Sequence, residues 1–210
     1  MTRLEKQMAF IEEVDKIKLI GRQNYLADGS RKENDAEHSW HLALMTLLLS
    51  EYSNEEIDVL KTMGMVLIHD IVEIDAGDTY AYDYEAQKTQ KEREIAAADR
   101  IFNILPEDQA KKLRALWDEF EAGETAEARF AAAVDRVQPA MLNSASGGIS
   151  WKEHDVTLSH VLGRNGKAAL GSQVLWDYEK EHFIMANVEK GLLKNDMEDK
   201  ADHARRTDKG

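Results

Sequence analysis

Apolar residues recur every three or four positions along most of this chain, which is the spacing of one face of an α-helix. The first such run covers residues 4–20, where Met8, Ile11 and Val14 lie three residues apart. β-Branched residues are scattered instead of forming alternating runs, and proline occurs only at positions 106 and 139. The pattern predicts an all-α fold.

Residues that favour helix ends divide the chain into separate helices. Ser53 to Glu56 has the spacing of a capping box, Thr125 can cap another helix, and Pro106 suits a first helical position. Pro139 is expected to kink or end the helix before it. The expected helices cover residues 4–20, from Asn34 or Asp35 to 51, 53–73, 84–105, 106–120, 125–135, 157–164 and 168–189.

The order of these helices predicts one domain. We find no internal repeat and no interdomain linker, so we expect residues 1–194 to form a single helical domain. After Gly191 the apolar periodicity is lost and the sequence becomes charged. We expect residues 195–210 to be a mobile tail, because chain ends without apolar contacts are seldom ordered.

The charge and composition of the chain limit its partners. A formal net charge of −13 disfavours a nucleic-acid polymer, although one metal ion and a local arginine can still attract a small phosphate substrate. Cysteine is absent, which excludes disulfides and thiolate zinc sites. The apolar stretch 42–49 is too short to span a bilayer and we see no N-terminal leader, so we expect a cytoplasmic protein.

Several residues in the predicted helices are of types that bind divalent cations: His38, the doublet His69-Asp70, and Asp135. Imidazole nitrogen suits transition metals, and carboxylate oxygen suits both hard and borderline ions. If all of them bind one octahedral ion, positions remain open for water and substrate. Open positions distinguish a catalytic metal from a structural one, so the set favours a metallohydrolase.

The alternative is that these residues have no common role, because a lone helical histidine is more often packed or exposed than a ligand. The position of the doublet argues against this alternative. It directly follows the apolar run 63–68, which is expected to be buried. Buried carboxylates are rare unless they are paired or bound to metal.

Residues after the doublet are candidates for the chemistry. Glu73 lies four residues beyond His69, one turn further along the same helical face, where its carboxylate can act on a bound water. The loop over residues 75–83 carries Asp78 and Thr79, and loops held on a rigid scaffold often contact substrate. Ordinary helix-end and loop carboxylates are the alternative here.

Segments 34–41, 67–79 and 133–139 closely resemble the HD-domain metal-dependent phosphohydrolases. Within that superfamily, the chain looks like the short, single-domain branch that includes 5′-deoxynucleotidases. The resemblance extends over residues 5–190. A His-Asp dipeptide alone carries no information, whereas the doublet extended to Thr79 in this order is a specific signal.

The resemblance implies a helical fold and a homodimer with a divalent ion in each chain. It implies that the ligands of this ion are His38, His69, Asp70 and Asp135. It further implies that Glu73 assists the attacking water and that Asp78 and Thr79 lie at the nucleotide.

Arginines of the first predicted loop are candidates for the substrate phosphate. Arg22 falls near the position where the family places a phosphate-binding arginine, and Arg31 is a weaker candidate for the same contact. A guanidinium can hold two phosphate oxygens at once. Some deoxynucleotidases have a bulky aromatic residue directly after this arginine, whereas this chain has Gln23. We therefore do not expect strict rejection of ribonucleotides.

These inferences favour hydrolysis of a nucleoside 5′-monophosphate to nucleoside and inorganic phosphate. Asp70, at the metal and the substrate, is a candidate to protonate the leaving 5′ oxygen. The ligand set leaves the metal open among manganese, cobalt, nickel, iron, zinc and magnesium. The alternatives are hydrolysis of another small phosphoester or nucleotide, and a non-catalytic binding protein in which the metal only stabilises the fold.

Overall fold

The computed structural model describes residues 1–79 and 84–197. Residues 80–83 of the predicted loop and residues 198–210 of the predicted tail lie outside this part. The α-helices are α1 (Arg3–Val14), α2 (Asp35–Leu49), α3 (Val59–Ile68), α4 (Glu73–Ala76), α5 (Tyr84–Phe102), α6 (Glu107–Ala122), α7 (Ala126–Ala145), α8 (Ile149–Glu153), α9 (Leu158–Asn165), α10 (Gln173–Glu179) and α11 (Ala186–Glu189). The 3₁₀ segments are η1 (Asp15–Leu19), η2 (Ser50–Tyr52), η3 (His69–Val72) and η4 (Gly166–Leu170), and η5 (Lys180–Met185) is π-helical. The prediction of an all-α fold is confirmed.

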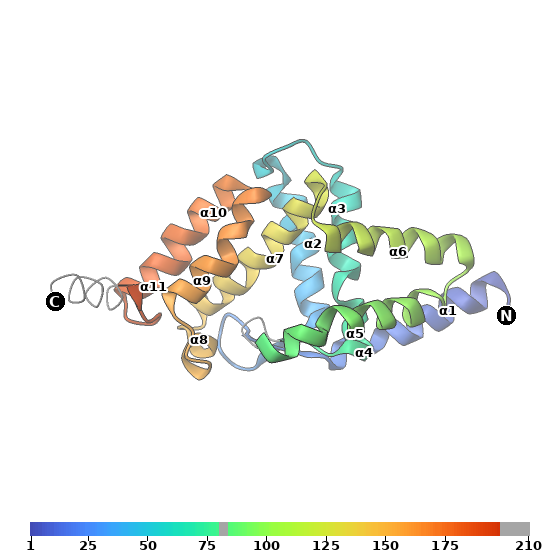
Figure 1. Cartoon of the computed structure of the whole chain (residues 1–210), viewed down its shortest axis with the longest axis horizontal. Helices are drawn as coiled ribbons and strands as arrows, with labels where there is room; N and C mark the ends of the chain where they lie inside the picture. Colours follow the sequence, from blue (N-terminus) through green and yellow to red (C-terminus); the bar gives the residue numbers. More distant parts are fainter. Residues whose placement is uncertain (80–83, 198–210) are drawn as a thin grey trace.

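Helices α2, α3 and α7 form the centre of the molecule (Figure 1). Their inward faces share a core cluster that includes the fully buried Leu42, Met65 and Phe130. A second cluster lies among η3, α5 and α6, and a third among α8, α9 and η5. In Figure 1, α1, α5 and α6 extend toward one end of the molecule, and α8 to α11 toward the other. The central helices therefore have packed neighbours on both sides.

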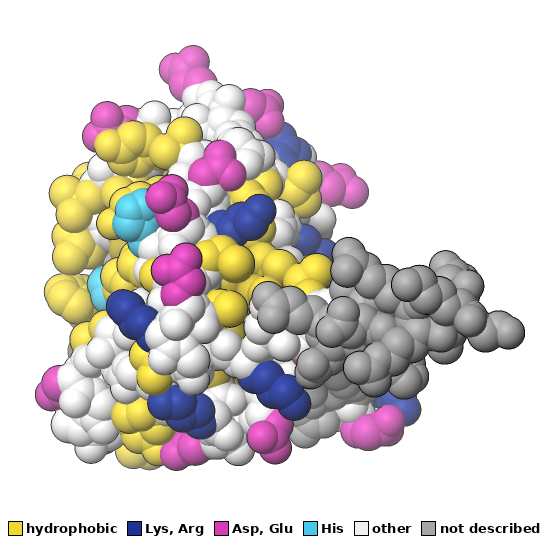
Figure 2. Space-filling model, turned by 90° about the vertical axis from the view of Figure 1, so that its left-hand side faces the viewer, with side chains coloured by type: hydrophobic (Ala, Val, Ile, Leu, Met, Phe, Trp, Pro, Cys, Tyr) yellow, Lys and Arg dark blue, Asp and Glu magenta, His cyan; other side chains and the backbone are white. Residues whose placement is uncertain are grey.

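The end of the molecule formed by α9, α10 and α11 carries apolar, acidic and basic side chains next to one another (Figure 2). Helix α10 exposes about half of the surface of Val174 and Tyr178. None of the helices within residues 1–79 and 84–197 is both long and apolar enough to cross a membrane.

A β-hairpin that the periodicity does not predict lies between η1 and α2. Its strands β1 (Gly21–Tyr25) and β2 (Lys32–Asn34) pair antiparallel. Gly29 has φ +70° in the connecting turn, where the Ser30 N–H donates to the Asp28 carboxylate at 2.9 Å. Both strands are short and mostly polar, so they lack the apolar alternation by which a strand is recognised. The sequence marks this segment only as a break between helices.

Helix α3 begins later than expected. Its N-cap is Asp58, whose carboxylate accepts a hydrogen bond from Lys61 N at 3.0 Å, so the prediction of a capping box at Ser53 to Glu56 is wrong. Asn54 instead contacts the segment before α10. Its side-chain amide donates to the Ala169 carbonyl at 2.8 Å, and its backbone N–H donates to the Gly171 carbonyl at 2.9 Å. These long-range contacts hold residue 54 outside a helix.

Pro139 is expected to kink or end its helix; helix α7 continues through it to Ala145, so the second of these two outcomes is wrong. The Pro139 carbonyl accepts hydrogen bonds from the side chains of Asn24 and Asn143, at 3.1 and 3.0 Å. Phe130 and Leu142, on either side of the proline, are both buried. This packing compensates for the one backbone hydrogen bond that proline cannot donate.

The single helix expected over residues 168–189 is divided. Ser172 interrupts it and caps α10 by accepting a hydrogen bond from Leu175 N at 3.1 Å. After α10, the chain continues as the π-helical segment η5. Ordered contacts also continue beyond residue 194. Asp196 accepts hydrogen bonds from the backbone N–H and the hydroxyl of Ser159, at 3.0 and 2.6 Å.

Candidate metal centre and substrate cavity

The central elements bring two imidazoles and two carboxylates to one point. His38 comes from α2, His69 and Asp70 from η3, and Asp135 from α7. His38 Nε2 and His69 Nε2 lie 3.1 and 3.7 Å from Asp135 Oδ1, and His69 Nε2 lies 3.1 Å from Asp70 Oδ1. Ligand atoms about 2.0–2.2 Å from a shared ion are separated by about 3 Å. The spacing of these atoms therefore suits one divalent ion.

The second nitrogen of each imidazole is held by an acceptor. His38 Nδ1 lies 3.0 Å from Gln138 Oε1, and His69 Nδ1 lies 2.9 Å from the Val66 carbonyl oxygen. Because both partners can only accept, Nδ1 is the donor in each ring, which leaves Nε2 as the nitrogen that a metal ion could use. His69 Nε2 is buried and makes no hydrogen bond. The donor set fits a divalent ion.

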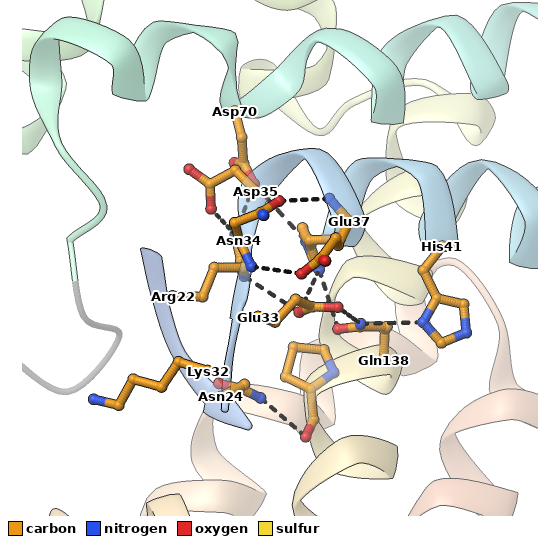
Figure 3. Close-up of polar contacts among 12 residues, drawn as sticks. Arg22, Asn24, Lys32, Glu33, Asn34, Asp35, Glu37, His41, Asp70 and Gln138 are labelled. Carbon is orange, nitrogen blue, oxygen red and sulfur yellow. Dashed lines mark hydrogen bonds and ion pairs between the residues drawn. The ribbon is translucent and has the colours of Figure 1, made fainter. Parts of the chain in front are cut away.

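Arg22 from β1 reaches into the same cluster (Figure 3). Its Nη1 lies 2.7 Å from Asp70 Oδ2 and 3.2 Å from Asp35 Oδ1, and its Nε lies 3.9 Å from Glu33 Oε2. Burial opposes the charge of the guanidinium, but the surrounding carboxylates, Asp70 foremost, raise the pKa of Arg22. Arg22 is therefore a permanently charged group beside the ligand Asp70.

The hairpin is attached by polar side chains to the helices that carry the ligand candidates. Gln138 Nε2 on α7 donates to Glu33 Oε1 at 2.7 Å, and the same amide holds His38 through its oxygen. Asn24 Nδ2 donates to the Pro139 carbonyl, and Asn34 forms a capping box with Glu37 at the start of α2 (Figure 3). Gln138 therefore links the hairpin directly to a metal-ligand candidate.

The pKa values of the ligand candidates indicate a cluster that attracts a cation. Burial, followed by the charge of the nearby Arg22, lowers the pKa of His38 to about 4. Burial opposes a charge on His69 as well, but Asp70 and Asp135 outweigh it and raise the pKa of His69 to about 10. In the metal-free protein, a proton on His69 thus compensates the two carboxylates. A divalent ion would replace that proton.

A cavity of about 230 Å³ opens beside the cluster. Its walls include Arg22, Gln23, His69, Asp70, Glu73, Asp78, Thr79 and Asp135, so most of the predicted site residues face one space. Glu73 Oε2 is buried and has no hydrogen-bond partner. Burial, followed by the charge of Asp70, raises the pKa of Glu73, and a bound cation would lower it again. Thr79 is held in place by Arg93, whose Nη2 donates to the hydroxyl at 2.9 Å.

Arg31 is not brought to this cavity. It lies at the hairpin turn, where its Nη1 donates to Glu37 Oε2 at 2.9 Å and its Nη2 to Glu37 Oε1 at 2.5 Å. Its side chain is half exposed and does not line the cavity. Of the two candidate arginines, only Arg22 faces the ligand cluster.

Other residues of the site were not identified from the sequence. Asp35 lies three residues before His38, and Gln138 lies three residues after Asp135, so helical spacing alone could have placed both near the ligands. Glu33 lies on a strand that the sequence does not reveal. Arg136 and Arg164 also line the cavity, and no motif in the sequence singles them out.

Comparison with known proteins agrees with this geometry. A family model described as HD domain matches residues 14–176. The 5′-deoxynucleotidase HDDC2 of Homo sapiens is 26% identical over 132 residues, covering 62% of this chain and 63% of the relative. The 5′-deoxynucleotidase YBR242W of Saccharomyces cerevisiae is 26% identical over 136 residues, covering 62% and 56%. The chain thus matches less than two thirds of the length of these curated relatives.

Two solved structures match a larger share of the chain than these curated relatives do. The crystal structure of a predicted metal-dependent phosphohydrolase from Magnetospirillum magnetotacticum MS-1 has a TM-score of 0.86 and 48% identity, covering 91% of this chain and 96% of that one. A conserved hypothetical protein from Pyrococcus furiosus has a TM-score of 0.59 and 25% identity, covering 82% and 98%.

Proposed function

The chain belongs to the HD domain family, and we propose that it is a metal-dependent phosphohydrolase that removes the 5′-phosphate from (deoxy)nucleoside monophosphates. The observation that carries this proposal is the meeting of three features in one cavity. These are the His and Asp ligand cluster, the unpartnered carboxylate oxygen of Glu73, and the guanidinium of Arg22. The names of the curated relatives and of the bacterial structure support the same chemistry.

The metal would be held by two imidazoles and two carboxylates, from His38, His69, Asp70 and Asp135. When bound, it would lower the pKa of a coordinated water and neutralise charge that develops on the phosphoryl oxygens. We propose one ion per chain, and we leave its identity open among manganese, cobalt, nickel, iron, zinc and magnesium because imidazole and carboxylate together accept all of them.

The protein side chains would supply proton transfer and orientation. Glu73, facing the cavity beside Asp70, would accept the proton of the attacking water as the oxygen bonds to phosphorus. As the bond between phosphorus and the 5′ oxygen breaks, Glu73 would return this proton to the leaving oxygen. Arg22 would hold the remaining phosphate oxygens.

Asp70 is better suited to binding than to donating a proton. Burial opposes its charge, but His69 and Arg22 hold its pKa below the usual range of a carboxyl group. An aspartate that stays ionised cannot protonate the leaving oxygen at neutral pH. We therefore assign the proton transfer to Glu73 and keep Asp70 as a ligand that also orients Arg22.

The alternatives are another phosphoester as the substrate, and a binding protein with a structural metal. A structural metal has no use for a further buried carboxylate that lines the cavity beside the ligand candidates, as Glu73 does, which favours an enzyme. Incubation with dAMP, AMP, dTMP, ATP and p-nitrophenyl phosphate, with and without EDTA, distinguishes these options by phosphate release. We expect EDTA-sensitive release from the monophosphates, and no release from any compound would refute the enzyme.

The same panel tests how the sugar is recognised. Gln23 lines the cavity directly after Arg22, and its Oε1 accepts a hydrogen bond from Lys32 Nζ at 2.6 Å. A glutamine leaves more room for a 2′-hydroxyl than a bulky aromatic side chain. We expect AMP to be hydrolysed, with only a modest preference for dAMP. Complete rejection of AMP would show that another residue recognises the sugar.

We also propose that the chain is a cytoplasmic homodimer. Helix α2 exposes Trp40, Leu44, Leu47 and Leu48, whose spacing places them on one side of the helix. A second copy would cover this apolar stripe. Light scattering after size exclusion would give the mass of a dimer, and Leu48→Glu would shift it to the monomer. Cell fractionation would test the location.

A further inference from the structure

The cavity has a basic part that the proposed reaction does not use. Arg136 on α7 and Arg164 on α9 line the same cavity as Arg22, Asp70 and Asp135. The proposed reaction already has a metal site and Arg22 for the scissile phosphate. Two further guanidinium groups therefore face the substrate space without an assigned partner.

Within residues 1–79 and 84–197, neither arginine has a counterion at ion-pair distance. Arg136 Nη1 donates to the Ala132 carbonyl at 2.6 Å. This carbonyl is neutral, so it does not compensate the positive charge of the guanidinium. Among the described residues, the Arg164 side chain makes no hydrogen bond, and no carboxylate oxygen lies within 4.0 Å of a charged nitrogen of either arginine. This differs from Arg22, which is surrounded by carboxylates.

The buried Glu179 and the cavity residue Asp78 form no ion pair with either arginine. Glu179 on α10 is fully buried, and its Oε1 accepts a hydrogen bond from Asn165 Nδ2 while Oε2 has no partner. Burial raises the pKa of Glu179 to about 8, and the charges of Arg136 and Arg164 oppose this rise. Asp78 is close enough for Arg164 to influence its pKa, but the two form no ion pair.

The two arginines also repel each other. Both line one cavity from the neighbouring helices α7 and α9, so two like charges face the same space. Two like charges held together at a partly buried surface are unfavourable unless an anion lies between them. Phosphate oxygens suit this position, since each planar guanidinium can donate two parallel hydrogen bonds to them.

We propose that Arg136 and Arg164 form a second anion subsite, which binds a phosphate group other than the one being hydrolysed. A dianion matches the two positive charges, whereas the neutral edge of a base would leave both uncompensated. The phosphate can be a second group on the substrate, such as a 3′-phosphate, or free inorganic phosphate. The link to a second substrate phosphate rests on the proposed function; the subsite itself does not.

Calorimetric titration with inorganic phosphate tests the subsite independently of activity. After EDTA treatment, the ligand cluster is rich in carboxylates, and Arg22 beside it is already paired with Asp70 and Asp35. Binding that remains and that depends on Arg136 and Arg164 therefore reports on the subsite. We expect wild-type protein to bind phosphate after this treatment, and Arg164→Gln to weaken the binding roughly tenfold, which is typical of a lost charge-assisted hydrogen bond.

Arg129→Gln is the matched control, because Arg129 lies on the same helix α7, pairs with Glu55 and does not line the cavity. It should bind phosphate as the wild type does. Circular dichroism would verify that each variant is folded, and Arg136→Gln repeats the test from the other side of the subsite. The proposal is overturned if EDTA-treated wild-type protein binds no phosphate, or if both Gln variants in the subsite bind it as tightly as the wild type.

Kinetics with the metal-loaded protein then identifies the source of the phosphate. The measured quantity is kcat/KM for deoxyadenosine 3′,5′-bisphosphate divided by kcat/KM for dAMP. A ratio above one that falls about tenfold in Arg164→Gln assigns the subsite to a second phosphate on the substrate. A ratio that Arg164→Gln does not change, together with arginine-dependent binding of inorganic phosphate, assigns it to free phosphate.

Discussion

The two walls of the cavity are built in different ways. On the helical wall, His38, His69 and Asp135 are placed by the backbones of α2, η3 and α7, and both histidines are almost fully buried. On the hairpin wall, Arg22 lies on a five-residue strand that is attached to the helices by side chains such as Asn24 and Glu33. The helical wall depends on core packing, whereas the hairpin wall depends on polar contacts.

This difference predicts how each wall responds to substitution. Loss of a proposed ligand on the helical wall would leave the other ligand candidates in place but remove one bond to the proposed metal. Loss of Arg22 leaves Asp70 and Asp35 without their cation. Loss of a ligand should lower the metal content. Loss of Arg22 should weaken substrate binding and leave the carboxylates beside it with an uncompensated negative charge.

The largest effect is expected on the helical wall. His69→Ala or Asp70→Ala should lower the metal content and reduce phosphate release below detection, while circular dichroism retains most of the helical signal. Metal analysis of the purified variants measures the first effect. His182→Ala is the control, since His182 is exposed on η5 and outside the cavity. Full metal content together with full activity would contradict the assignment of the site.

Glu73→Gln separates chemistry from metal binding. It preserves size and removes the basic carboxylate of Glu73, a residue that lines the cavity. We expect kcat to fall by about two to four orders of magnitude, which is usual for a general base, with the metal content unchanged. Loss of metal in this variant would mean that Glu73 is a ligand.

On the hairpin wall, Arg22→Ala should reduce kcat/KM for dAMP roughly 10- to 150-fold, from a charge-assisted contact of about 1.5–3 kcal/mol. Arg22→Lys should recover only part of this, because an ammonium cannot form the two-pronged contact. Arg31→Ala is the informative comparison within the same hairpin. If Arg31→Ala costs more than Arg22→Ala, the phosphate lies on the other side of the hairpin from the ligand cluster.

Substitution of Gln138 tests the connection between the two walls. At saturating metal, we expect it to lower activity less than the substitutions above. Gln138→Leu removes the acceptor of the His38 Nδ1 proton and the donor to Glu33. Loss of such a supporting contact typically weakens metal affinity by about 10- to 100-fold. Competition with a chelator would measure the affinity. Gln109→Leu is the control, because Gln109 pairs with Gln7, away from the cavity.

The same difference explains what the sequence could predict. Apolar spacing revealed the helices, and the residues around His38, the doublet and Asp135 are compact motifs within them. The hairpin has no such signal, because its polar strands are ordered by partners more than a hundred residues away, as in the contact of Asn24 with Pro139. Arg164 likewise reaches the cavity only through the packing of α9 against α7, which no local pattern encodes.

The central claim is that one ion binds between His38, His69, Asp70 and Asp135. A crystal structure of the manganese-loaded protein, with the metal located by its anomalous signal, tests it most directly. We predict one strong peak about 2.0–2.2 Å from His38 Nε2, His69 Nε2 and an oxygen of each aspartate. A second group of carboxylates, Asp35, Asp70 and Glu73, is also close enough to hold an ion. A peak among these three residues, with none between the histidines, would contradict the claim.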